Sequence, residues 1–133
     1  EDALASLSGD DKGEKKSVDI KLAISAYISE EYILEDRVRL ELYRRLSKAS
    51  DIQDIYKIEE EMEDRFGKPD IFTKQFIELI IIKILALNLG IQSISSYEMN
   101  ITFTKANDTK ETIKSPSKDD DDIIATTLRY LRK

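Results

Sequence analysis

Residues 51–90 read DIQDIYKIEEEMEDRFGKPDIFTKQFIELIIIKILALNLG, and this stretch predicts two successive helices. In its first part, apolar residues recur every three or four positions, as they do on the buried face of a surface helix. Gly67 readily adopts the conformation that ends a helix, and the proline two residues later cannot continue one. We therefore expect one helix over residues 51–66, a sharp stop, and a second helix that Asp70 caps and that runs to about Leu89.

The two predicted helices differ in where their apolar residues lie. In the first, Ile55, Ile58 and Met62 share one face, and most of the carboxylates lie on the other. In the second, apolar residues surround most of the circumference, which predicts a central core helix. Ser50, with Gln53 three residues later, predicts a capping box at the start of the first helix.

The flanking sequence predicts two more helices and about four strands. Apolar residues at helical spacing, including Leu40, predict a helix over residues 34–48 and an amphipathic helix from residue 117 onward. Residues 25–33 show no regular period and are expected to cross the fold as an irregular or extended segment. Alternating apolar residues predict strands over residues 18–24, 91–97, 99–104 and 111–114.

These elements predict an α+β domain, with a mixed or antiparallel sheet of about four strands packed with four helices. Residues 1–17 lack sustained periodicity and are rich in Gly, Ser, Lys and Asp, so we expect a linker that follows a preceding domain. The domain itself is expected over residues 18–133.

The composition excludes several classes of chemistry. The chain has no cysteine and no histidine, so thiol catalysis and zinc–thiolate sites are excluded and the commonest general base is missing. The net charge of −6 predicts poor nucleic-acid binding, because that affinity comes mostly from neutralising phosphates. Charged residues interrupt the apolar stretch 71–89, which predicts a buried helix and no membrane span.

The polar face of the 51–66 helix carries the candidate interaction residues. Glu61 and Asp64 lie one turn apart and could together receive an arginine or lysine of a partner. The helical pattern alone favours an ordinary solvated face. No metal-binding spacing is present, and exposed carboxylates lack the enclosing cleft of a catalytic pair, so no catalytic, metal or cofactor residue is predicted. Arg65 is expected to pair with Glu61 or to brace the following turn.

Two other charged segments have simpler interpretations. A basic edge formed by Arg37, Arg44, Arg45 and Lys48 is interrupted by Glu41, which predicts the intrahelical ion pairs Glu41–Arg45 and Arg37–Glu41.

The aspartates of KDDDD, residues 118–122, favour a helix start through capping and the helix dipole. Consecutive helical residues point in different directions, so we expect that they cannot all bind one ion.

Three motifs together resemble a known family. LYRRL at 42–46, E-x-x-DRFG at 61–67 and LGI at 89–91 are spaced as in the C-terminal domain of the bacterial transcription-repair coupling factor. The resemblance covers about residues 18–103. After Phe103 the chain has only a short connection where many members of the family carry a further helix and strand.

The resemblance implies a regulatory function. The whole protein of this family is a cytoplasmic, ATP-dependent DNA translocase that removes stalled RNA polymerase and recruits UvrA through a UvrB-like module. Its C-terminal domain has no ATPase motif and needs no cofactor; it packs on the UvrB-like module and masks the UvrA-binding surface. Glu61 and Asp64 would then face basic residues of that module, with Arg65 in support, while Glu59, Glu60 and Glu63 keep the surface soluble.

Three alternatives remain open. The first is a free-standing acidic protein-interaction adaptor. The second is a small hydrolase that uses Glu61 and Asp64. The third is direct nucleic-acid binding through Arg37, Arg44 and Lys48.

Overall fold

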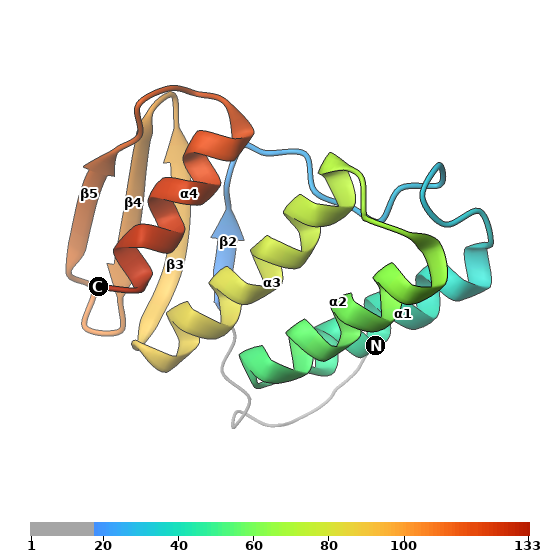
Figure 1. The fold of residues 1–133 in the computed structure, drawn as a ribbon. Helices are drawn as coiled ribbons and strands as arrows, with labels where there is room; N and C mark the ends of the chain where they lie inside the picture. Colours follow the sequence, from blue (N-terminus) through green and yellow to red (C-terminus); the bar gives the residue numbers. More distant parts are fainter. Residues whose placement is uncertain (1–17) are drawn as a thin grey trace.

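The computed structural model describes residues 18–133, so the linker expected over residues 1–17 lies outside the described residues. The described part contains four helices and a four-stranded sheet (Figure 1). In chain order, the elements are β2 (Asp19–Lys21), α1 (Asp36–Lys48), α2 (Ile52–Phe66), α3 (Ile71–Asn88), β3 (Ile91–Tyr97), β4 (Asn100–Lys105), β5 (Lys110–Lys114) and α4 (Asp120–Leu131).

The sheet is mixed, which confirms the predicted α+β class. Its strand order is β2-β3-β4-β5; β2 runs parallel to β3, and the other neighbours are antiparallel. Figure 1 shows α4 lying across the sheet next to α3, with α1 and α2 on the far side of α3 from the strands. The helix α3 therefore stands between a sheet half and a helical half.

The hydrophobic core consists of two clusters that meet at α3. Ile77 and Ile81 pack towards α1 and α2, whereas Ile82 and Ala86 belong to the cluster under the sheet. Leu85 contacts both clusters. Burial on several sides explains why α3 is apolar around most of its circumference, as predicted, and makes it the central helix.

Most of the observed helix ends agree with the ends predicted from the sequence. Asp70 caps α3 by accepting a hydrogen bond from the Thr73 backbone N–H at 3.0 Å. At the start of α2 the prediction was wrong by one residue: Asp51, and not Ser50, accepts from the Gln53 N–H. Gly67 ends α2 with a φ of +88°, a value that strains any residue with a side chain.

The segment between β2 and α1 departs most from the prediction. The strand expected over 18–24 pairs only at Asp19–Lys21, because the chain then leaves the ladder and the Ala23 N–H binds the Ser96 hydroxyl. The irregular crossing that follows buries Ile28 and Ile33. On α1, Leu40 was expected on the packed face but is 57% exposed.

Candidate protein-interaction site

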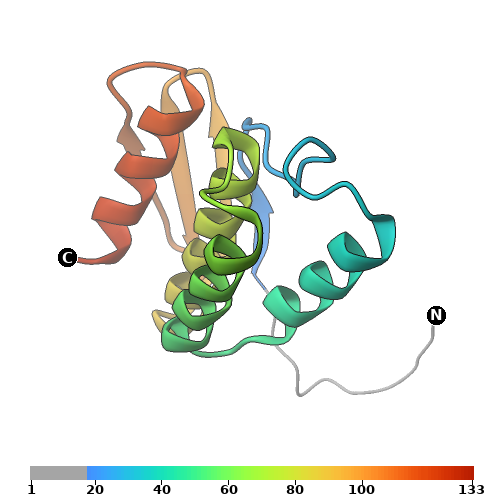
Figure 2. The same cartoon turned by 45° about the vertical axis from the view of Figure 1, so that its right-hand side comes forward.

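The polar face of α2 turns away from the core. Ile55, Ile58 and Met62 are buried in the helical half, so the opposite face is left to solvent. Figure 2 brings this half of the domain forward. Asp64 is exposed on that face and makes no ion pair or side-chain hydrogen bond within residues 18–133. Glu60 and Glu63 are exposed beside it.

Glu61 lies on the same helix but is already engaged. The guanidinium of Arg45, on α1, donates to both carboxylate oxygens, at 2.8 Å to Oε2 and 2.9 Å to Oε1. This two-point geometry is the strongest form of an arginine–carboxylate pair. The hydrogen bond from Arg45 holds the pKa of Glu61 below its ordinary value, and the same bond raises the pKa of Arg45. The pair ties α1 to α2 at the surface.

This geometry corrects the pairing expected for the basic edge. Arg45 pairs with Glu61, across two helices, and not with Glu41 on its own helix. Within residues 18–133, Arg37 forms no ion pair with Glu41 either. The connection at residues 49–51 is short enough to make α1 and α2 neighbours. Sequence spacing alone could not show which side chains face each other across them.

Arg65 lies next to the Arg45–Glu61 pair and contacts Glu61, as predicted. Its Nη1 lies 3.8 Å from Oε2 of Glu61, one turn earlier on α2. Its guanidinium also lies over the Phe66 ring, 4.8 Å from the ring centroid. Glu61 therefore has a cation on either side, whereas Asp64 has none among the described residues.

Glu59 has a structural role that the sequence analysis missed. Its side chain is only 13% exposed and pairs with Lys74 of α3 at 2.7 Å. The hydrogen bond that Lys74 donates to Glu59 raises the pKa of Lys74. Glu59 thus belongs to the contact between α2 and α3 and is not part of the solvated surface.

Tyr32 fixes the end of α2 next to this surface. Its hydroxyl donates to the Gly67 carbonyl at 2.6 Å and lies 3.3 Å from the Met62 carbonyl. The ring packs edge-on against Phe66. Burial, followed by the negative charge of Glu63 and other nearby carboxylates, raises the pKa of Tyr32 to about 12.

This raised pKa predicts a loss of stability at alkaline pH. A phenol with a higher pKa in the folded protein stabilises the fold in its protonated form. The stabilisation is complete below about pH 10, the ordinary tyrosine value, and is lost as the pH rises through about 12. Urea unfolding should show a falling midpoint over this window in the parent protein. In Tyr32→Phe the fall should be shallower.

Tyr97→Phe is the matched control, because Tyr97 is 76% exposed. Its urea midpoints should follow those of the parent protein at every pH. An equally steep fall in Tyr32→Phe would contradict the assignment to Tyr32.

The hydrolase alternative needs carboxylates that line a hollow. A groove of about 410 Å³ lies where α1 ends and α2 begins, lined by Arg45, Lys48, Ala49, Asp54, Lys57 and Ile58. Neither Glu61 nor Asp64 lines this groove. Its lining carries more positive than negative groups, so it does not supply the paired acids that such an enzyme would use.

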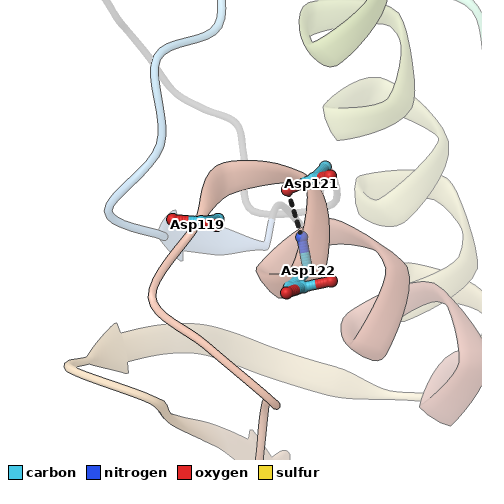
Figure 3. A group of neighbouring side chains, drawn as sticks. All are labelled: Asp119, Asp121 and Asp122. Atoms are coloured by element: carbon cyan, nitrogen blue, oxygen red, sulfur yellow. Dashed lines mark hydrogen bonds between the residues drawn. The ribbon is translucent and has the colours of Figure 1, made fainter.

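Three of the four aspartates at the start of α4 lie close together. Carboxylate oxygens of Asp119, Asp121 and Asp122 all lie within 4.8 Å of one another (Figure 3), whereas Asp120 is not part of this group. Asp119 is the N-cap residue but its side chain accepts no capping hydrogen bond. Ser117 donates to Asp122 at 2.6 Å, and the Asp122 N–H donates to Asp121. The helix dipole favours acids at this position without any bound ion.

Comparison with known proteins places this domain in a family. The model of the TRCF domain matches residues 22–115, which is most of the chain. The match extends past Phe103, where the sequence analysis placed the end of the resemblance, and includes β5. The chain belongs to the TRCF domain family.

Relatives and a solved structure agree with this assignment. The chain is 48% identical to the transcription-repair-coupling factors of Helicobacter pylori strains J99 and 26695, over 98% and 99% of its length. It is 35% identical to that of Buchnera aphidicola over 74% of its length. It spans only 13% of either Helicobacter relative and 12% of the Buchnera one.

The fold is that of a crystal structure described as the C-terminal domain of transcription-repair coupling factor. The TM-score is 0.65 at 22% identity, over 68% of this chain and 56% of that one. Every helix within residues 18–133 is too short or too polar to span a lipid bilayer.

Proposed function

We propose that this domain is the non-catalytic, autoinhibitory C-terminal part of a transcription-repair coupling factor. In this proposal it docks on the UvrB-like module of its parent chain and masks the surface that binds UvrA. The parent is a cytoplasmic, ATP-dependent DNA translocase that removes stalled RNA polymerase. Membership in the TRCF family supports this proposal for the parent chain, because the relatives are named transcription-repair-coupling factors.

The observation that carries the docking proposal is the outward acidic face of α2. Asp64 is exposed and unpaired within residues 18–133, with Glu60 and Glu63 beside it. Glu61, one turn away, is held at the surface with its side chain 41% exposed. A cationic surface of a partner would gain ion pairs here without any rearrangement of the helix backbone.

The energetics suit a contact that must open. Exposed ion pairs typically contribute less than about 1 kcal/mol each. A contact made of a few such pairs holds while its two sides are tethered in one chain and yields to a competing partner. Because the charges are exposed, raising the ionic strength should weaken docking.

The test is binding of this domain to the UvrB-like module of the same parent chain, measured by titration calorimetry. Glu61→Arg with Asp64→Arg should abolish detectable binding, and Asp64→Arg alone should weaken it. Glu60→Arg is the matched control: it reverses a neighbouring charge of the acidic face that is not one of the two proposed docking residues, and should bind more tightly than Asp64→Arg.

Glu61→Arg places a third cation beside Arg45 and Arg65, so thermal unfolding of each variant must accompany the titration. Full binding by a folded double reversal would remove the proposed site.

A further inference from the structure

The acidic face of α2 contains a built-in competitor for any basic partner. Arg45 occupies both oxygens of Glu61, at 2.8 and 2.9 Å, and Arg65 lies 3.8 Å from one of them. An incoming arginine or lysine therefore finds Asp64 available but Glu61 already neutralised. To use Glu61 fully, the partner has to replace the Arg45 guanidinium.

Arg45 has a second carboxylate within reach. Glu41 lies four residues earlier on α1, which is the spacing at which helical side chains pair. Glu41 is exposed and forms no ion pair within residues 18–133. Besides the hydrogen bond that Arg45 donates to Glu61, the negative charge of Glu41 also raises the pKa of Arg45, as expected of a nearby carboxylate.

The Arg45 side chain is placed to move between the two acids. It is 37% exposed, and its side-chain hydrogen bonds within residues 18–133 all go to Glu61. Leaving Glu61 for Glu41 exchanges a partly exposed, two-point pair between α1 and α2 for an ion pair within α1. Both acids are at least partly exposed, so no fully buried group loses its partner.

We infer that Arg45 is an internal competitor that sets the affinity of the acidic face, pairing with Glu61 when the domain is undocked and with Glu41 when a cationic surface takes Glu61. This inference rests on the proposed docking function and adds a regulating residue to it. The basic partner finds the Asp64 carboxylate unpaired within residues 18–133. It can pair fully with Glu61 only by displacing Arg45. Docking is thereby kept weaker than the number of acids on α2 suggests.

The test is the same calorimetric titration with Arg45→Met, which removes the charge and keeps an apolar stem. Freed from competition, Glu61 should raise the affinity for the UvrB-like module by up to about fivefold, the most that one exposed ion pair typically supplies. The same variant should unfold at a lower temperature, because the link between α1 and α2 is lost. A residue with only a structural role would weaken binding instead.

Two further variants separate the exchange from a general change in charge. Arg44→Met removes the same charge one residue away, from an exposed side chain without an ion pair in residues 18–133. It should change the affinity less than Arg45→Met does. Glu41→Gln removes the alternative acceptor and should weaken docking about twofold in the parent background. In the Arg45→Met background it should have no such effect.

The two proposals fail in different ways. Should the folded Glu61→Arg, Asp64→Arg variant bind like the parent, the docking site itself is wrong. If that variant loses binding while Arg45→Met binds no more tightly than Arg44→Met, docking stands and the competitor inference is overturned.

Discussion

Phe103→Ala should lower the free energy of unfolding by about 3–5 kcal/mol, the usual cost of removing a fully buried aromatic ring. Phe103 is 0% exposed on the inner face of β4, under α4. Its ring stacks on Tyr130 with 4.0 Å between ring centroids. Truncation removes this contact and leaves a cavity between the sheet and α4, which the rigid strands cannot close.

Urea unfolding followed by far-ultraviolet circular dichroism would measure this loss. The matched control is Thr102→Ala, the neighbouring position on the opposite face of the strand. Thr102 contributes one hydroxyl contact with Thr112, at 2.9 Å and exposed, so its removal should cost about 1 kcal/mol or less. Similar losses in the two variants would contradict the assignment of Phe103 to the core.

Gln75→Leu should cost about 1–3 kcal/mol, because it leaves partly buried polar groups without a partner. Gln75 is 3% exposed on α3, and its Nε2 donates to the Ser25 carbonyl at 2.5 Å and to Asp120 at 3.2 Å. Asp120 in turn accepts from the Ser25 N–H at 2.9 Å. This small network joins the segment after β2, the central helix and the first turn of α4.

Gln53→Leu is the control for Gln75, since the Gln53 side chain is exposed and makes no hydrogen bond within residues 18–133. Amide hydrogen exchange would add a local measurement: the first turn of α4 should lose protection in Gln75→Leu. A Gln75 variant as stable as the Gln53 variant would show that solvent satisfies the network equally well.

The helices could be predicted from the sequence because their signals are local. Asp70 and Gly90 bracket α3, and Gly67 ends α2 at the expected residue. The start of α2 was wrong by one position because Ser50 and Asp51 both have suitable side chains. Only the backbone geometry, set by the packing of α1 against α2, decides which one caps.

Long-range contacts were harder to predict. The burial of Ile28 and Ile33 depends on packing with α1, α2 and α3, of which α2 and α3 lie well beyond them in the sequence, and an irregular segment has no period that would indicate it. The Arg45–Glu61 pair joins residues 16 positions apart, so the usual helical pairing with Glu41 was the natural prediction. The sequence predicted the acidic face of α2, but it did not show which carboxylates of that face already pair with an arginine or lysine of the domain.

The position of α3 between the two hydrophobic clusters restricts how relatives of this domain can diverge. A substitution on either face of α3 also affects packing in the other hydrophobic cluster, because residues such as Leu85 contact both clusters. The helical half that carries the acidic surface and the half that carries the sheet therefore cannot be exchanged between family members as independent modules. A chimera would have to take α3 from one parent and adapt the facing residues of the other.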